Sequence, residues 1–249
     1  MANREIIEEL SYKTVYKEGN TVVKEFTASH PKADVFNEAY IHACAESSGV
    51  SVPQLLGVAP AGAGWALTME YIPGKTLWEL MQENPDRQDE YLDKFVEIQL
   101  EVASHKAPRL RNTRLKMEEA INSLTELDPS TRYELLQRLH GMKNHTKLCH
   151  GDLVPDNIII REDGSYCVLD WSHATQGNAG ADAAITYMRF YLIDPALAEK
   201  YLRVFSKKSN MAIQYIQTWL PIVAAARLTR HKESEKELLE KWISVAEYQ

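Results

Sequence analysis

The stretch LCHGDLVPDNIIIREDGSYCVLDWS, residues 148–172, places polar residues where short apolar runs end. The runs 158–160 and 166–169 predict two brief strands, and Glu162, Asp163 and Gly164 between them favour a turn. A third short run, at 147–148, precedes a histidine and an aspartate. The pattern predicts a small hairpin with hydrogen-bonding and charged groups at its ends.

These polar residues suit the transfer of a phosphoryl group. Such a reaction needs a cation on the phosphates, metal-binding oxygens, and a carboxylate that positions and deprotonates the attacking hydroxyl. Asp152 would be that carboxylate. Asn157, five residues later, would offer an amide oxygen to Mg²⁺, and Asp170 at the end of the hairpin would offer a carboxylate to the same ion. Oxygen ligands favour Mg²⁺, whereas a zinc site would require clustered thiolates or imidazoles.

The residues before residue 73 predict a small antiparallel sheet with one helix. Thr14–Phe26 contains two β-rich runs around Glu18-Gly19-Asn20, which predicts a hairpin. The stretch 33–47 has the apolar spacing of a helix. The runs PQLLGVA and WALTMEYI, separated by PAGAG, predict a second antiparallel pair.

Beyond Pro73 the pattern becomes helical. Thr76 and Glu79 match a capping box, which marks a helix start. Amphipathic spacing predicts further helices at about 88–105, 115–127 and 129–142, and helices return from about residue 180. Pro221 lacks an amide donor and should bend or break the segment 211–230.

Composition narrows the class of protein. With 249 residues, of which 45% are hydrophobic, the chain can bury the core of one large domain or of two small lobes. A net charge of -7 argues against a nucleic-acid partner. The three cysteines form no CxxC pair and fit a reducing compartment, and we find no signal segment or membrane-length apolar run. We therefore expect a cytoplasmic protein without a membrane partner.

The motif HGDLVPDN at 150–157 resembles the HxDxxxxN catalytic loop of the aminoglycoside phosphotransferase and choline kinase family, small-molecule relatives of the protein kinases. The LDW at 169–171 is similar to the metal-binding segment of that family. The resemblance spans about residues 12–190 and implies an α+β, protein-kinase-like, two-lobed fold. Its smaller lobe, 1–71, would be an antiparallel sheet with one helix that binds nucleotide. Its larger lobe, 72–249, would be mainly helical and hold the catalytic loop and the acceptor site.

The resemblance also implies roles for residues outside the motif. Lys24 would contact the α- and β-phosphates, and Glu38 would orient Lys24 through an ion pair. Glu70, Tyr71 and Ile72 would form the hinge whose backbone binds adenine. Asp182 would stabilise the large lobe.

Within the catalytic loop, His150 accompanies Asp152. We expect His150 to brace the loop by hydrogen bonds rather than to perform chemistry. Lys24, Asp152, Asn157 and Asp170 are expected to converge on one nucleoside triphosphate and its metal ion.

The implied activity is a direct in-line phosphoryl transfer from ATP, with GTP as an alternative donor, assisted by Mg²⁺. Two other hypotheses stay open. The segment LSYKTVYKEG lacks the early glycine that relatives commonly have at the phosphates, which favours a degenerate kinase that binds nucleotide or acts as an interaction module. A protein kinase would instead phosphorylate a polypeptide.

The acceptor is expected to be a small molecule that carries a hydroxyl. Little chain separates Asp170 from the helix near Gly180, and no APE triplet follows, so a peptide-docking segment has no room. The run His231–Glu240 contains four glutamates, which would suit a cationic acceptor such as an aminoglycoside or an amino alcohol, or would form a solvated helix face. No heptad repeat is present, and the sequence predicts no oligomeric state.

Overall fold

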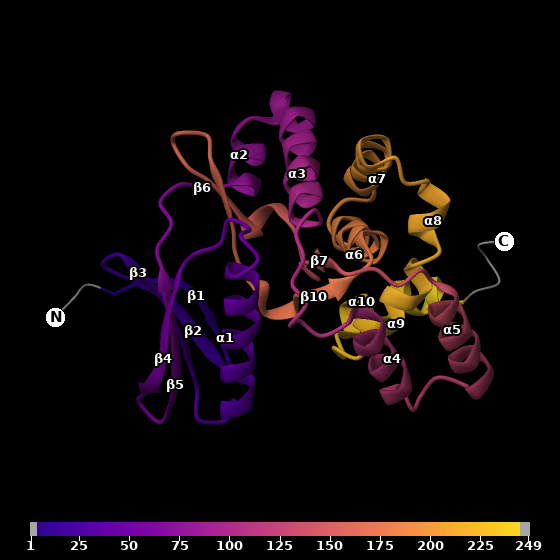
Figure 1. Cartoon of the computed structure of the whole chain (residues 1–249), viewed down its shortest axis with the longest axis horizontal. Helices are drawn as coiled ribbons and strands as arrows, with labels where there is room; N and C mark the ends of the chain where they lie inside the picture. Colours follow the sequence, from indigo (N-terminus) through magenta and orange to yellow (C-terminus); the bar gives the residue numbers. More distant parts are fainter. Residues whose placement is uncertain (1–3, 245–249) are drawn as a thin grey trace. The chain divides into compact units, whose positions relative to one another are not determined.

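The computed structural model describes residues 4–244, which form strands, α-helices and three short 3-10 helices (Figure 1). The strands are β1 Arg4–Leu10, β2 Lys13–Glu18, β3 Thr21–Phe26, β4 Leu55–Ala61, β5 Gly64–Glu70, β6 Lys75–Thr76, β7 Lys147–Cys149, β8 Ile158–Ile160, β9 Tyr166–Val168 and β10 Thr175–Gly177. The α-helices are α1 Lys32–Glu46, α2 Leu77–Glu83, α3 Gln88–Val102, α4 Thr113–Ser123, α5 Pro129–Gly141, α6 Ala179–Tyr191, α7 Pro195–Ser209, α8 Ile213–Gln217, α9 Leu220–Leu228 and α10 Glu233–Ile243.

Packing divides the chain into two compact units. The sheet unit combines the residues up to Pro85 with Pro155–Ala174, and the helical unit combines Asp86–Val154 with the residues from Thr175 onward. These units do not coincide with the lobes expected from the sequence, 1–71 and 72–249. The difference arises because the hairpin of β8 and β9 packs with the sheet unit, where the Val168 N–H donates to the Ser51 carbonyl at 2.9 Å.

The sheet unit is built on a five-stranded antiparallel sheet in the order β1-β2-β3-β5-β4. The hairpin expected over Thr14–Phe26 is present as β2 and β3, and Gly19 in its turn has a positive φ of 60°. Strand β1 was not expected from the sequence. All its residues are exposed, so it lacks the alternation of buried and exposed side chains that marks a half-buried strand, and it pairs only at the sheet edge.

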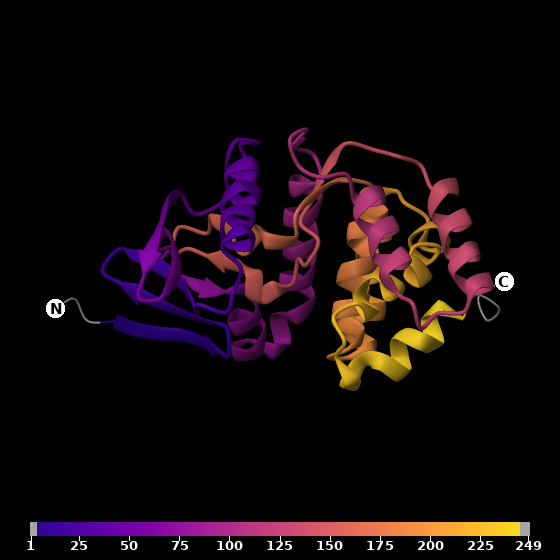
Figure 2. The ribbon, with the colours of Figure 1, turned by 90° about the horizontal axis from the view of Figure 1, so that it is seen from below.

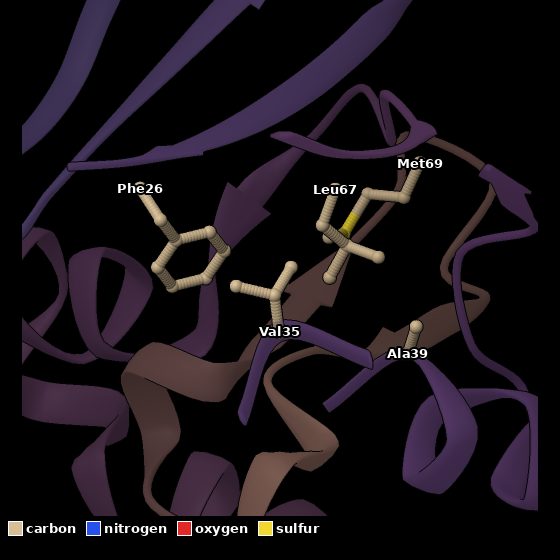
Figure 3. Packing of buried hydrophobic residues seen from close by; sticks show 5 residues of the cluster. All are labelled: Phe26, Val35, Ala39, Leu67 and Met69. Carbon is tan, nitrogen blue, oxygen red and sulfur yellow. The ribbon is translucent and has the colours of Figure 1, made fainter. Parts of the chain in front are cut away.

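Helix α1 covers one face of this sheet and forms the core of the unit. Val35 and Ala39 project from successive turns of α1 toward Phe26, Leu67 and Met69 of the strands (Figure 3). Val35 and Leu67 are fully buried. The 3.6-residue period of the helix and the two-residue period of the strands therefore meet in one apolar layer.

The helical unit packs its helices around α9. Helix α9 contacts α4, α5, α6 and α10, and these elements lie side by side in Figures 1 and 2. Pro221 lies in the first turn of α9, where its missing N–H costs no helical hydrogen bond, so the expected interruption of 211–230 is confirmed as a break between α8 and α9. Strands β7 and β10 of this unit form a two-stranded antiparallel sheet in which Cys149 pairs with Thr175.

Two further features concern the cysteines and the lengths of the helices. The cysteines Cys44, Cys149 and Cys167 are free and buried, which agrees with their expected role as small core side chains. Across residues 4–244, every helix is too short or too polar to cross a membrane.

Replacing Leu67 with alanine should lower the free energy of unfolding by about 2–5 kcal/mol, because the truncated side chain leaves a cavity under α1. Leu56→Ala is the matched control, since Leu56 lies in the neighbouring strand β4 and is 50% exposed. We expect a change within about 0.5 kcal/mol for it. Urea denaturation measures both, and equal losses would contradict the placement of Leu67 at the centre of the core.

Candidate functional site

Lys24 is a buried cation in the middle of the sheet. It lies on β3, the central strand, with Val15 and Leu67 as its cross-strand neighbours, and it is 9% exposed. The two-residue period places Lys24 on the same face as Val22 and Phe26, which is the face that α1 covers. An ammonium in such a position must be paired, since burying a lone charge is costly.

Two carboxylates pair with Lys24 within the sheet unit. Its Nζ donates to Glu38 Oε1 at 2.7 Å and to Asp170 Oδ1 at 2.9 Å. Burial acts to lower the pKa of Lys24, but the charges of Asp170 and Glu38 outweigh it and raise this pKa above its ordinary value. Lys24 therefore stays charged, as a phosphate-binding group must.

Glu38 reaches Lys24 because it lies on the inward stripe of α1. Val35, Ala39 and His42 are buried on this helix, and residue 38 falls at the three-residue spacing from Val35 on the same side. The Glu38 side chain is 17% exposed. The ion pair that the resemblance implied is present.

The hairpin of β8 and β9 explains the spacing between Asn157 and Asp170. Ile158 pairs with Val168, so the residues just outside this pair lie at one end of the hairpin. The Leu169 N–H donates to the Asn157 carbonyl at 2.8 Å, which fixes the two chain segments beside each other. Asn157 and Asp170, thirteen positions apart in sequence, thus occupy neighbouring segments.

Asp170 has a backbone conformation that L-residues rarely adopt. Its φ is 54°, and its carboxylate also accepts from Ser172 Oγ at 3.2 Å. The next residue anchors the turn, because Trp171 is 1% exposed and its Nε1 donates to the Val168 carbonyl at 2.9 Å. Strained positions of this kind persist where the surroundings fix them and are frequent at functional sites.

A cavity of about 270 Å³ opens beside this pair of carboxylates. Glu38 and Asp170 line it together with Tyr12, Lys13 and His30. The His30 ring lies between Tyr12 and Phe26, with centroid distances of 5.5 and 4.7 Å. Lys13 was not singled out from the sequence, since a lysine in a hairpin is usually solvated, yet its side chain is only 14% exposed and its Nζ lies 3.2 Å from Glu8 Oε2.

The oxygen donors in the sheet unit fit Mg²⁺. Asp170 offers a carboxylate and Asn157 an amide. No group of three or more His, Cys, Asp or Glu that could enclose a metal occurs within residues 4–244. The protein would therefore supply one or two ligands and leave the other positions to phosphate oxygens and water, which is the usual arrangement for Mg²⁺.

The expected hinge follows β5. The Glu70 N–H donates to the Gln54 carbonyl at 2.9 Å, the Gln54 N–H donates to the Glu70 carboxylate at 3.2 Å, and Ile72 is buried. The Tyr71 N–H donates to the Asn20 carbonyl at 2.9 Å, so it is already used inside the sheet unit. The N–H groups of Glu70 and Tyr71 are therefore both used inside the sheet unit, and Ile72 is the hinge residue better placed to donate to a base.

Residues 150–154, the first part of the expected catalytic loop, belong to the helical unit and are held by a buried aspartate. Asp182 on α6 is 3% exposed, and its carboxylate accepts the His150 N–H at 3.2 Å and the Gly151 N–H at 2.7 Å. Burial raises the pKa of Asp182, and the two N–H donors oppose that shift. Gly151 has a φ of 80°, a conformation that favours glycine.

His150 lies within this loop as a brace. It is fully buried, and its Nδ1 accepts the Asp152 N–H at 3.3 Å. This hydrogen bond fixes the backbone of Asp152, whose side chain is 14% exposed. The geometry agrees with the structural role expected for His150.

Arg189 is the functional residue that sequence reasoning missed most clearly. Its Nε lies 3.1 Å from Asp152 Oδ1, as an ion pair without the alignment of a hydrogen bond. A signal was present in the sequence, because Arg189 follows Asp182 by seven residues, which is two helical turns on one face of α6. Fixing Asp182 at the catalytic loop would have placed Arg189 on the same side.

Lys116 on α4 was also missed. Burial, together with the charges of Arg230 and Arg111, lowers the pKa of Lys116 to about 8, while Asp152 and Asp182 act in the opposite direction. Its neighbourhood in the helical unit is therefore unusually rich in cations for a protein with a net charge of -7.

Comparison with known families matches residues 6–213 to the phosphotransferase enzyme family. Among solved structures, the chain is similar to a thermostable mutant of aminoglycoside phosphotransferase APH(4)-Ia in complex with AMP-PNP and hygromycin B. That match has a TM-score of 0.71 at 16% identity and covers 97% of this chain and 90% of the other.

Two more structures illustrate the breadth of the likeness. A choline/ethanolamine kinase family protein from Mesorhizobium loti matches with a TM-score of 0.61 at 14% identity, over 100% of this chain and 90% of the other. A GDP complex of a mutant aminoglycoside 2'-phosphotransferase-IIIa matches with a TM-score of 0.62 at 18% identity, over 96% and 91%. A comparison with curated proteins gave no match. At these identities the structural likeness shows the fold, and it confirms the α+β architecture that the sequence predicted.

The lowered pKa of Lys116 makes stability depend on pH. Between about 8 and the ordinary lysine value of 10.5, the unfolded chain binds more protons than the folded protein, so the free energy of unfolding should rise with pH. In Lys116→Gln this contribution should be absent, so the difference in unfolding free energy between the two proteins should change with pH across this window and be constant below about pH 8. Denaturation of both proteins across the window measures it, with Lys207→Gln at an exposed site of α7 as control. Parallel curves for wild type and Lys116→Gln would contradict the assigned environment.

Proposed function

The chain belongs to the phosphotransferase enzyme family, and we propose that it is a kinase that transfers the terminal phosphoryl group of a nucleoside triphosphate to a hydroxyl of a small molecule. The observation that carries the proposal is the pairing of buried Lys24 with Glu38 and Asp170, beside a cavity. A charged lysine fixed between two carboxylates is a means of binding phosphates, and one of those carboxylates is the residue assigned to the metal ion.

In the proposed reaction, Lys24 would bind phosphate oxygens, and Asn157 and Asp170 are the residues that would hold Mg²⁺. When bound, Mg²⁺ would offset the negative charge of the phosphates. The backbone of the hinge, residues 70–72, would bind the base of the nucleotide, with ATP as the expected donor. Of the three solved structures named above, one carries AMP-PNP and one carries GDP, so the choice between adenine and guanine is left to experiment.

Asp152 acts as the base in the proposed mechanism. The acceptor oxygen forms a bond to the γ-phosphorus, and the bond from the γ-phosphorus to the bridging oxygen breaks, with its electron pair leaving on the nucleoside diphosphate. The hydroxyl proton passes to the Asp152 carboxylate. His150 and Asp182 hold the loop so that Asp152 keeps one orientation.

The small size of the acceptor follows from the chain between Asp170 and α6. Residues 171–178 hold a 3-10 helix and strand β10, and α6 begins at Ala179. This segment is too short for the long peptide-docking loop of a protein kinase, which makes that alternative the weaker one.

The run His231–Glu240 gives no specific support to the cationic acceptor for which it was considered. Of the four glutamates, Glu235 is buried in an ion pair with Arg227, and the other three are exposed on α10. The run therefore provides a solvated helix face rather than an acidic surface that would collect amines.

A degenerate kinase remains the second hypothesis, because the turn between β1 and β2 carries Ser11 and Tyr12 instead of glycine. A thermal shift with nucleotide, measured with and without Mg²⁺, followed by nucleotide consumption over a panel of hydroxyl compounds, separates the two. Binding without turnover over the whole panel would favour the degenerate kinase.

Asp152→Ala should retain nucleotide binding and lose turnover by at least about 100-fold, because it removes the general base. Asp156→Ala is the matched control, since Asp156 is exposed in the same loop. Binding is read from the thermal shift with AMP-PNP and turnover from nucleoside diphosphate release. Turnover that survives in Asp152→Ala would show that the base has been wrongly assigned.

Asp170→Asn should abolish the part of the nucleotide-induced thermal shift that depends on Mg²⁺, because it removes the charged ligand of the ion. The nucleotide shift without Mg²⁺ serves as the internal reference, which separates metal binding from the lost contact with Lys24. Asp156→Asn should behave as wild type. An unchanged Mg²⁺ effect in Asp170→Asn would remove Asp170 from the metal site.

A further inference from the structure

Three cationic side chains of the helical unit interact electrostatically with Asp152. Arg189 on α6 is the contact already described, at 3.1 Å from Asp152 Oδ1, and its side chain is 26% exposed. The base of the proposed reaction therefore has a guanidinium beside it, and this cation is partly open to solvent.

A second cation follows α9. Arg227 in the last turn of α9 is neutralised, since its guanidinium donates to both oxygens of Glu235 at 2.6 and 2.7 Å. Arg230 lies one turn later, and its N–H donates to the Arg227 carbonyl. Partial desolvation, with the charges of Arg227 and Arg189, lowers the pKa of Arg230, whereas Asp152 acts to raise it. Arg230 and Arg189 thus lie within electrostatic reach of Asp152 and of each other.

A third cation comes from α4. Helix α4 packs on α9, which brings Lys116 into the same region. The charges of Arg230 and Asp152 both act on Lys116, in opposite directions. We call Arg189, Lys116 and Arg230 the cation cluster.

Three carboxylates, Asp152, Asp182 and Glu235, act electrostatically on Lys116 and Arg230, and two of the three also bind other groups. Asp182 is committed to the backbone N–H groups of the catalytic loop, and Glu235 is committed to Arg227. Asp152 is thus the carboxylate shared by the three cations. An excess of positive charge in a partly desolvated site repels a polyamine and favours a group of opposite charge.

We propose that the acceptor is an anionic hydroxy compound, whose oxyanion binds the cation cluster through Arg189, Lys116 and Arg230 while its hydroxyl faces Asp152. This inference rests on the proposed function of Asp152 as the base. A guanidinium has five N–H donors in one plane, so Arg189 can hold Asp152 and a second oxyanion together. The cluster selects the acceptor by charge, and the phosphoryl transfer itself follows the bond changes given above.

The test uses the full chain saturated with AMP-PNP and Mg²⁺, so that the nucleotide site is filled. Inorganic sulfate is the simplest oxyanion probe. Four sugars of similar size then compare charge: glucuronate and glucose 6-phosphate as the anions, glucose as the neutral compound and glucosamine as the cation. Calorimetry measures binding, and nucleoside diphosphate release with ATP measures turnover.

Sulfate and at least one anionic sugar should bind, and the anionic sugar should bind about tenfold or more tightly than glucose, with glucosamine no tighter than glucose. A preference for glucuronate would identify a carboxylate acceptor, and a preference for glucose 6-phosphate a phosphate acceptor. Binding of neither anion, or tighter binding of glucose or glucosamine, would overturn the proposal.

Variants separate charge selection from a structural role of Arg189. Arg189→Gln should reduce the ratio of anion to glucose affinity about tenfold, and Arg189→Glu should reverse the preference toward glucosamine. A structural role would weaken all sugars alike and leave this ratio unchanged, which would contradict the inference. Arg203→Gln, an exposed site on α7, should leave the ratio as in wild type.

The same titrations without nucleotide distinguish the two proposals. A protein that fails to bind the Mg²⁺ nucleotide but binds sulfate in an Arg189-dependent manner would refute the proposed kinase function and retain the anion site. A protein that binds nucleotide but shows no Arg189-dependent anion binding would retain the kinase function and refute the anionic acceptor.

Discussion

The buried ammonium of Lys24 is the constraint on which the sheet unit depends. A charge in the middle of a sheet is tolerated only when oppositely charged partners reach it, and removing one partner of such a pair typically costs about 3–5 kcal/mol. Glu38 reaches it from α1 and Asp170 from the end of β9. One cation thereby fixes the helix and the hairpin against the sheet, and the same contact would position Lys24 for the proposed binding of phosphate. Stability and proposed chemistry are coupled here because both require that the two carboxylates stay in place.

In the helical unit, the main constraint is the fixed backbone of the short loop that begins at His150. Asp182 is buried so that its carboxylate can bind two consecutive backbone N–H groups, and His150 completes the brace from inside the loop. Helix α6 then carries Arg189 two turns beyond Asp182, so one rigid element fixes both the loop and the cation next to its aspartate. Groups fixed on one helix keep their spacing, which is what selection by charge requires.

Local patterns in the sequence predicted the fold well, whereas contacts made by a single side chain were harder to predict. The hairpin at Thr14–Phe26 and the break at Pro221 follow from turn chemistry and from the missing proline amide, which act locally. Strand β1 was missed because all its residues are exposed, so its sequence shows no alternation of apolar and polar side chains. Arg189 and Lys116 were missed because a cation on a helix is usually solvated, and only the packing of α4, α6 and α9 brings them together. The carboxylates around Lys24 were identified through a family resemblance, since no spacing rule links residues 24, 38 and 170.

The buried thiols offer a view of how each unit opens. Cys44 and Cys167 belong to the sheet unit and Cys149 to the helical unit, and all three are covered by the core. Burial raises the pKa of Cys167 to about 11 and that of Cys149 well above its ordinary value, so neither forms a reactive thiolate while its surroundings stay closed. Alkylation of each cysteine is therefore limited by local opening. The alkylation rates of the three cysteines would report how often each unit opens locally in the native protein.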